Sequence, residues 1–399
     1  MLWNERVEVF TLTNGLTVYH QYYPEAVAGV VVLYRVGSAY EEAGKTGMAH
    51  ILEHLMFNGT KRYGPFSNYV EAWGGYDNAF TDRDITLYHT VVPADRLPDV
   101  LRLEADRMEN LTFNNFGAEK SVILEEYLLS ENEDDERLWT EVFAHLWPDS
   151  PYSNPVSGWP EDVSGLTLSD LEDFYGRYYT PNNALLVVVS PYTLEEVRRY
   201  VREAFEKISA GSGVRRPPHG PPPYRWFKSV TVKLKRPRRF VLAFRLGRPS
   251  LKYNTVLNVF TRVLDLERSS PLWPLVEEGH IEMFNVRNYE YEGGNVVAVI
   301  GEVSPGSTVP SDRIMDVLTG FVPRKDIVDR VKRMFKSEFV FSYEEAESVS
   351  INVALTAYLY GEVPSLSASL RMYDEVSLED LIAVRRDLGS APSVLVMYG

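Results

Sequence analysis

Two short stretches of the sequence recur in the same order at a fixed distance. Residues 166–171 (LTLSDL) resemble residues 376–381 (VSLEDL) at an offset of 210 residues. Each stretch is typical of a helix start, with Thr167 or Ser377 as the N-cap and acidic residues in the first turn. A short apolar stretch follows each of them at nearly the same distance: residues 185–189 and residues 394–397. Two matches in register predict that the chain contains one domain twice.

A segment rich in proline and glycine separates the two copies. Residues 211–223 have the sequence GSGVRRPPHGPPP. Proline and glycine at this density cannot sustain a helix or a central strand, and successive prolines favour an extended spacer. We therefore expect an N-terminal domain at 1–210, a linker at 211–225 and a C-terminal domain at 226–399.

The first copy mixes strands and helices without strict alternation. Its patterns predict a hairpin at 11–18 that turns at Asn14-Gly15, and strands at 30–36, 86–92 and 185–189. They predict helices at 47–57, 93–111, 118–135 and 160–179. This order favours a mixed sheet covered by helices over a doubly wound parallel sheet.

Composition narrows the classes of partner. The chain contains no cysteine, so a bound metal ion would be held by histidine and carboxylate side chains. A net charge of −15 argues against binding to nucleic acid or to anionic membranes. Residues 1–19 lack the basic start and apolar run of a signal peptide, and the longest apolar stretches are too short to span a bilayer. We therefore expect a cytoplasmic protein with no nucleic-acid or membrane partner.

The most specific local feature is the pentapeptide His50-Ile-Leu-Glu53-His54. On a helix, His50 and His54 lie one turn apart on the same face, so both imidazoles can converge on one metal ion. Glu53 lies near that face and can take a proton from a water molecule bound to the metal. The order of these residues is that of the inverted zinc-peptidase motif. Tetrahedral zinc then lacks one protein ligand, which in this chain must be a carboxylate or a histidine from another element.

Candidates for the missing ligand lie in the helix predicted at 118–135. Glu119 and Glu126 are almost two turns apart and share a face, whereas Glu125 points about 100° away from Glu126. Val122 and Ile123 lie between them, which suggests that this face is the inner one. A carboxylate on an inner face needs a partner such as a metal ion. By periodicity alone, Glu126 is equally well an ordinary solvated acid of a helix.

The residues around this pentapeptide resemble a known peptidase family. Residues 50–60 (HILEHLMFNGT) are similar to the inverted zinc motif of the family of pitrilysin, insulin-degrading enzyme and mitochondrial processing peptidase. Further blocks match in the family's order: 74–81, 103–111, 119–126, 150–159 and 174–184. The resemblance covers nearly all of residues 1–210 and is weaker across 226–399. It implies an α+β fold of two homologous domains, each a mixed, mostly antiparallel sheet covered by helices.

The resemblance also implies a zinc-dependent endopeptidase. His50, His54 and Glu126 would bind one Zn²⁺ per chain. Glu53 would act as the general base, and Glu119 would be a supporting carboxylate.

The implied substrate is a peptide or an unfolded segment, which adds as an extended strand to a sheet edge. Asn78, Ala79 and Phe80 would line that edge, and Phe57 would lie near the scissile bond. For Phe57, packing in the core and lining of the substrate pocket are equally good interpretations.

One expected element of the family is missing. Active members carry an Arg, with a Tyr seven residues later, in the C-terminal domain, and this pair helps to hold the substrate and to stabilise the oxyanion. The matching region is 272–284, where Val276 stands near the place of the Arg and residues 281–283 near that of the Tyr. We therefore expect the zinc-bearing member of a heterodimer with a homologous chain that carries the Arg/Tyr pair. A homodimer is the second choice. The alternative function is a non-catalytic core-type subunit or a peptide-binding member of the same fold.

Overall fold

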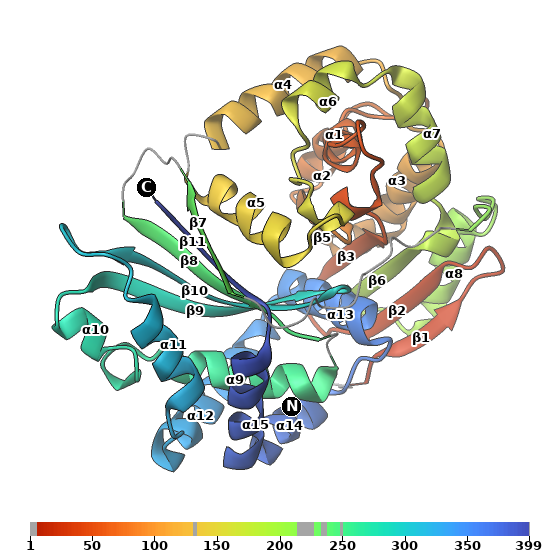
Figure 1. Ribbon diagram of the computed structural model, residues 1–399. Coiled ribbons are helices and arrows are strands. Elements are labelled where there is room, and N and C mark those ends of the chain that lie inside the picture. The colour runs from red at the N-terminus through yellow and green to blue at the C-terminus, as the bar shows by residue number, and fades with distance from the viewer. Residues whose placement is uncertain (1–5, 131–133, 214–226, 233–237, 248–249, 399) are drawn as a thin grey trace. The chain divides into compact units, whose positions relative to one another are not determined.

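The computed structural model describes residues 6–130, 134–213, 227–232, 238–247 and 250–398. These residues form two compact units (Figure 1). Unit 1 comprises Met1–Tyr127, Asn154–Pro217 and Val340–Ser367, and unit 2 comprises Leu128–Ser153, Pro218–Phe339 and Ala368–Gly399. From residue 214 onward, the linker expected at 211–225 lies outside the described residues.

Unit 1 is built on a six-stranded sheet with the order β1-β2-β6-β3-β5-β4. Its strands are β1 (Glu8–Thr11), β2 (Thr17–Tyr22), β3 (Val27–Tyr34), β4 (Tyr76–Thr81), β5 (Thr86–Pro93) and β6 (Ala184–Ser190). The pair β2 and β6 is parallel, and every other neighbouring pair is antiparallel. The central strands β3 and β6 are valine-rich and almost completely buried, as expected for strands covered on both faces. The position of β4 leaves it at one edge of the sheet.

Unit 2 repeats this arrangement in a five-stranded sheet with the order β7-β11-β8-β10-β9. Its strands are β7 (Phe227–Val232), β8 (Arg239–Arg245), β9 (Ile281–Tyr291), β10 (Gly294–Val303) and β11 (Ser393–Tyr398). Here β7 and β11 are parallel and the other pairs antiparallel. Strand order and direction match those of unit 1 from β2 onward, and β7 begins 210 residues after β2. The predicted duplication of an α+β domain is confirmed.

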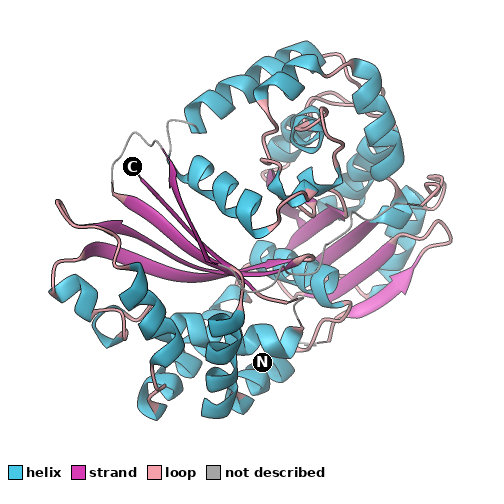
Figure 2. Cartoon of the chain, in the orientation of Figure 1, coloured by secondary structure: helices cyan, strands magenta, loops and turns pink. Residues whose placement is uncertain are grey.

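The helices cover the two sheets and follow the same repeat (Figure 2). The first copy supplies α1 (Met48–Leu55), α2 (Phe66–Ala72), α3 (Leu97–Glu109), α4 (Phe116–Ser130), α5 (Asp134–Leu146), α6 (Pro160–Gly165), α7 (Leu168–Tyr178) and α8 (Leu194–Phe205). The second copy supplies α9 (Leu251–Leu264), α10 (Pro274–Glu277), α11 (Ser311–Gly320), α12 (Lys325–Ser342), α13 (Ala346–Tyr360), α14 (Leu366–Glu375) and α15 (Leu378–Ser390). Helices α7 and α15 each begin with a capping box, in which Thr167 or Ser377 is the N-cap as predicted.

Two predicted helices differ from the observed ones. The helix expected at 160–179 is divided into α6 and α7, because Thr167 is extended and its side chain accepts a hydrogen bond from the Asp170 amide. The helix expected at 118–135 begins two residues earlier, at Phe116, and is followed to Ser130; residues 131–133 lie outside the described residues. At Thr167, a new helix start interrupts a sequence pattern that is compatible with one long helix.

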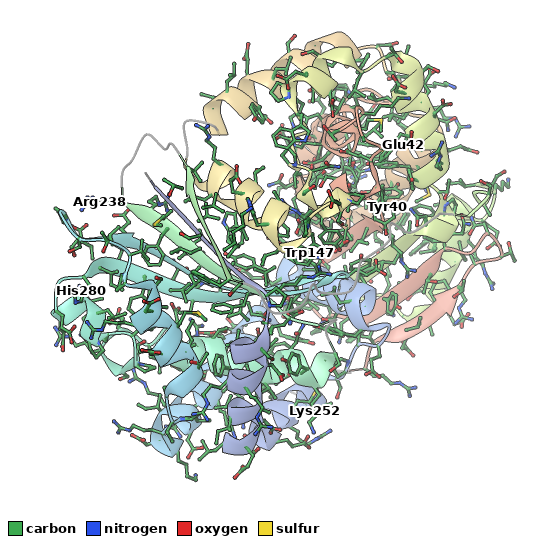
Figure 3. All side chains as sticks on the ribbon, viewed as in Figure 1. Tyr40, Glu42, Trp147, Arg238, Lys252 and His280 are labelled. Carbon is green, nitrogen blue, oxygen red and sulfur yellow. The ribbon has the colours of Figure 1, made fainter. Side chains whose placement is uncertain are left out.

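One helix of each copy packs on the sheet of the other copy. Helix α5 belongs to the first copy in sequence but packs on β8 and β11 of unit 2, whereas α13 of the second copy packs on β3 and β6 of unit 1. Gly29 of β3 permits the close approach of α13, because a Cβ atom there would lie 2.6 Å from the Ala346 carbonyl oxygen. In unit 2, Trp147 directly follows α5 and is labelled in Figure 3. Its ring stacks on Tyr152, with ring centroids 5.1 Å apart, and holds the end of the helix. The compact units therefore contain segments from both sides of residues 211–225.

Candidate metal centre

Helix α1 carries the motif residues and is only eight residues long. One face is apolar, and the other carries His50 and His54. Its apolar side chains are buried: Met48, Ala49, Ile51, Leu52 and Leu55. His50 and His54 are only partly buried, with 19% and 22% of their side chains exposed. Gly47 precedes the helix with a φ of 92°, a left-handed conformation that favours glycine. The apolar side chains fix the buried face of α1, and the imidazoles stay accessible on the other.

Helix α4 brings a carboxylate to both imidazoles. Glu126 Oε2 lies 3.8 Å from His50 Nε2 and 3.7 Å from His54 Nε2. One potential ligand atom from each of the three residues lies within 4.8 Å of the other two. Two imidazole nitrogens and one carboxylate oxygen form a donor set that suits zinc and leaves one coordination position open. Burial, and then the neighbouring His54, lower the pKa of His50 to about 4, which favours the neutral imidazole that metals require.

Glu119 holds the other side of the His54 ring. Its Oε2 lies 3.2 Å from His54 Nδ1, and its Oε1 accepts a hydrogen bond of 2.7 Å from Asn58 Nδ2. A carboxylate on Nδ1 fixes the tautomer and leaves Nε2 free, which is the usual arrangement around a metal-binding histidine. Asn58 was not among the predicted site residues, although its position four residues after His54 is a signal that could have indicated it.

Glu53 is a buried carboxylate beside this cluster. Its Oε2 accepts a hydrogen bond from the hydroxyl of Thr81, at the end of β4. Burial raises the pKa of Glu53, while the Thr81 hydrogen bond and the nearby His54 oppose the shift. Thr81 was also not among the predicted site residues. It is two residues after Ala79, so both side chains lie on the same face of β4, and this spacing could have indicated it.

The inner face predicted for α4 is narrower than expected. Ile123 is fully buried, but Val122 is 39% exposed, so the prediction that both face inward is wrong for Val122. The Glu126 side chain is 45% exposed, and Glu125 is exposed. The buried face of α4 therefore includes Ile123, and Glu126 lies at the edge of that face, where it is partly exposed to solvent.

Asn78, Ala79 and Phe80 lie together on β4, the edge strand of unit 1. The amide of Ala79 donates a 2.8 Å hydrogen bond to Asn78 Oδ1. It therefore points toward the open edge, and in an antiparallel ladder the carbonyl of the same residue points the same way. Phe57 is half-buried and packs near Tyr88 of β5, with ring centroids 6.1 Å apart. This arrangement leaves backbone groups available to a further strand next to Glu53.

The region expected to hold the Arg/Tyr pair lies in unit 2. Val276 is in the four-residue helix α10 and packs against the apolar core. Ile281 begins β9 and is buried. Between them, Gly279 has a φ of 74° and turns the chain. The sequence contains no Arg between 262 and 287 that is followed by a Tyr seven residues later.

Within the described residues, no helix combines the length and the apolar character needed to cross a membrane.

Two family models match the chain. The model described as "Insulinase (Peptidase family M16)" matches residues 16–158, and that described as "Peptidase M16 inactive domain" matches residues 165–321. The first match contains the whole of α1 and α4, and thus His50, His54 and Glu126.

Curated relatives are described as zinc proteases. "Zinc protease PqqE" of Helicobacter pylori is 35% identical over 209 residues, which is 50% of this chain and 47% of that protein. An uncharacterized zinc protease of Rickettsia bellii is 28% identical over 213 residues, 52% of each protein. The chain thus spans about half the length of these two relatives. An uncharacterized zinc protease of Mycobacterium tuberculosis is 26% identical over 396 residues, 95% of this chain and 90% of that protein.

Solved structures share the fold along the whole chain. A protease from Helicobacter pylori superposes with a TM-score of 0.90 at 25% identity, over 98% of this chain and 99% of that one. A chain of complex III2 from Candida albicans superposes with a TM-score of 0.81 at 15% identity, over 98% and 95% of the two chains, which shows the fold alone. Two successive family matches, zinc-protease relatives and this fold lead to one conclusion: the chain belongs to peptidase family M16, the insulinase family.

Proposed function

We propose that the chain is a zinc-dependent endopeptidase that hydrolyses peptides or unfolded segments. The observation that carries this proposal is the convergence of His50, His54 and Glu126, whose ligand atoms lie within 4.8 Å of one another beside the buried Glu53. The names of the curated relatives support the same chemistry.

Four carboxylate and imidazole groups have two roles at this site: three would bind the metal, and one would transfer protons. His50, His54 and Glu126 would hold the Zn²⁺, one ion per chain. When bound, zinc polarises a carbonyl oxygen and lowers the pKa of water, which makes hydrolysis possible near neutral pH. Glu53 takes the proton of the attacking water and delivers it to the leaving amine. Its raised pKa makes it a stronger base, and the hydrogen bond from Thr81 holds one oxygen so that the other can face the water.

The substrate would bind as an extended strand along β4. Ala79 offers its amide and its carbonyl at the open edge, once the Asn78 side chain releases the amide. Main-chain pairing of this kind selects for extended backbone before it selects for side chains. Phe57 and Phe80 would then contact side chains near the scissile bond. Folded proteins lack free extended segments, so peptides and unfolded segments are the expected substrates.

We also infer that the chain acts with a homologous chain that supplies the Arg/Tyr pair. Val276 stands near the place expected for the Arg and residues 281–283 near that of the Tyr; Val276 and Ile281 pack into the apolar core of unit 2. A homodimer is the second choice. The missing pair also counts for the alternative, a non-catalytic subunit or a peptide-binding member of the fold, whereas the intact set of His50, Glu53, His54 and Glu126 counts against it.

The test is an assay of peptide hydrolysis with the zinc-loaded chain alone and mixed with a homologue that carries the Arg/Tyr pair. Hydrolysis in the mixture should fall by about 10²–10⁴-fold in Glu53→Gln, the range for loss of a general base, while zinc content stays unchanged. Full turnover by the chain alone would remove the heterodimer and leave the peptidase. Zinc binding without hydrolysis in either case would instead support the non-catalytic alternative.

A further inference from the structure

We propose that Glu41 is a positioning residue of the metal centre: its buried carboxylate fixes the start of α1 and thereby places His50 next to Glu126. The inference rests on the proposed function, because it concerns the same zinc site. Glu41 does not touch the ligands, and its role would be exerted through the helix backbone.

Glu41 caps α1 from six residues upstream of the N-cap. The residue is 4% exposed and lies in the loop between Tyr40 and Glu42, which are labelled in Figure 3. Its Oε2 accepts a 2.7 Å hydrogen bond from the Gly47 amide, and its Oε1 accepts a 2.8 Å bond from the Ala49 amide. These amides have no partner within the helix, and the two oxygens of the Glu41 side chain satisfy both of them. Ala49 directly precedes His50, so the cap acts one residue away from a predicted ligand.

The turn before α1 is also locked from its other side. The Thr46 hydroxyl donates a 2.8 Å hydrogen bond to Asp162 Oδ2 and accepts another of 2.8 Å from the Trp159 amide. At Gly47, a Cβ atom would lie 2.7 Å from the side chain of Val163. The start of α1 therefore has little room to shift or to rotate.

His50 depends on this lock more than His54 does. Glu119 orients His54 through its Nδ1. His50 Nδ1 is buried and has no hydrogen-bond partner among the described residues. Its imidazole is consequently placed by the backbone of α1 and by packing, and His50 is only the third residue of an eight-residue helix. A helix of this length is marginal by itself, so its first turn needs external support.

The equivalent helix of unit 2 shows that the fold does not require a buried acid here. At an offset of 210 residues, Leu251 corresponds to Glu41. Helix α9 begins there with an ordinary cap, in which the Ser250 side chain accepts from the Tyr253 amide. It then continues for 14 residues without any of the histidines. Burial raises the pKa of Glu41 to about 8 against the pull of the backbone amides, so the acid is retained at a cost in stability. Unit 1 thus has this destabilising buried acid at the start of α1, the helix that carries the predicted ligands His50 and His54.

The experiment compares zinc affinity in the full chain and in Glu41→Gln. Glutamine has one acceptor oxygen instead of two, so one of the two amides loses its partner. The dissociation constant is measured by competition with a chromophoric chelator, at a temperature where far-UV circular dichroism shows both proteins folded. We expect about tenfold weaker zinc binding, within the range for residues that support a metal ligand. We also expect an altered visible spectrum after Co²⁺ substitution, which a change in stability alone would not produce.

Glu196→Gln is the matched control. Glu196 also accepts from a backbone amide at a helix start, that of Thr193 before α8, but α8 carries no residue of the site. It should leave the zinc dissociation constant and the Co²⁺ spectrum unchanged.

Equal zinc affinity and equal spectra in Glu41→Gln and the unmodified chain would overturn the inference and leave the proposed function intact. Failure of the unmodified chain to bind zinc would refute both. If Glu41→Gln does not fold, Glu41→Asp replaces it, because aspartate keeps both oxygens on a shorter arm. Zinc binding several-fold weaker than in the unmodified chain would support the inference, and equal binding would overturn it.

Discussion

Units 1 and 2 share one arrangement of strands and helices, but their equivalent helices α1 and α9 carry different side chains. Those of α1 at the motif positions are polar, and those of α9 are apolar. In α1 these positions hold the motif residues, of which the two histidines are partly exposed and Glu53 is hydrogen-bonded. In α9, 210 residues later, the corresponding residues are apolar and buried in the core of unit 2: Phe260, Val263 and Leu264. The scaffold therefore does not need polar groups at these positions. Their presence in unit 1 is best explained by the site.

Two more positions extend the comparison. Lys336 of α12 corresponds to Glu126 and forms an ion pair with Asp374, with 2.9 Å between the charged atoms. In α3, the buried pair of Glu104 and Arg107 corresponds to Ile314 and Val317 in α11. Unit 2 is thus a natural reference that shows which residues of unit 1 the fold can do without.

The largest effect is expected from removal of the third predicted ligand. Glu126→Gln replaces a carboxylate by a neutral amide at the position where unit 2 has a lysine. We expect zinc affinity to fall by more than about 100-fold, the upper end of the range for residues that only support a ligand. Isothermal titration with Zn²⁺ measures this. Glu125→Gln is the matched control, because Glu125 is exposed on the same helix and points away. Equal losses in the two variants would contradict the assignment of Glu126.

The second effect concerns the buried ion pair. Arg107 donates hydrogen bonds of 2.6 and 2.7 Å to Glu104, and its guanidinium lies 4.1 Å from the ring centroid of Phe66. Arg107→Val alone leaves a buried carboxylate without its partner, and we expect the free energy of unfolding to fall by about 3–5 kcal/mol.

The double variant Glu104→Ile/Arg107→Val installs the pair that unit 2 uses. We expect it to recover part of the lost stability, because an apolar pair needs no compensation for a buried charge, whereas the cavity left by the smaller valine keeps a cost of its own. Chemical denaturation of the two single variants and the double variant measures the coupling. A double variant as unstable as Arg107→Val would show that unit 1 cannot accommodate the apolar pair found in unit 2.

The third prediction is a difference in pH dependence. Burial raises the pKa of Glu41 from 4.5 to about 8, so the folded state binds this proton more tightly than the unfolded state. The resulting stability is fully present below pH about 4.5 and is lost as the pH rises through about 8, at about 1.4 kcal/mol per pKa unit. Metal-free protein should therefore lose more stability between pH 5 and pH 9 than Glu41→Gln does. Parallel pH profiles would show that Glu41 ionises normally in the folded chain.

The smallest effect is expected at the two capping boxes, where the units are most alike. Asp170 and Asp380 each bind back to the N-cap residue of a helix. Asp170→Asn and Asp380→Asn should each cost about 1 kcal/mol of the free energy of unfolding at pH 7. Asp170 should lose slightly more, because its hydrogen bonds with Lys45 and Thr167 lower its pKa to about 2. Thermal unfolding of the two variants measures these losses. A loss of stability in only one of the two variants would show that the two capping boxes do not contribute equally.

Local sequence patterns predicted those parts of the molecule that depend on one element at a time. The spacing of His50 and His54 and the shared face of Glu119 and Glu126 follow from helix geometry, and the two N-caps follow from local hydrogen bonding. Glu41 had no such signal, because its partners lie beyond a turn whose shape depends on tertiary packing.

The exchange of α5 and α13 could not be predicted for a similar reason. Each helix has an apolar face that could pack on either sheet, since the two sheets are copies of one another. Which sheet it covers is decided by particular contacts, such as the close approach of Ala346 to Gly29. Thr81 likewise contacts Glu53 only because β4 is placed beside α1.

We expect the first copy of the repeat to bind one metal ion and the second copy to bind none. The most direct measurement is the zinc content of the full chain after equilibration with Zn²⁺ and removal of the excess, by elemental analysis against protein concentration. We expect one zinc ion per chain, and none in the double variant His50→Ala/His54→Ala. A chain that retains no zinc, or a double variant that retains as much as the unmodified chain, would contradict this expectation.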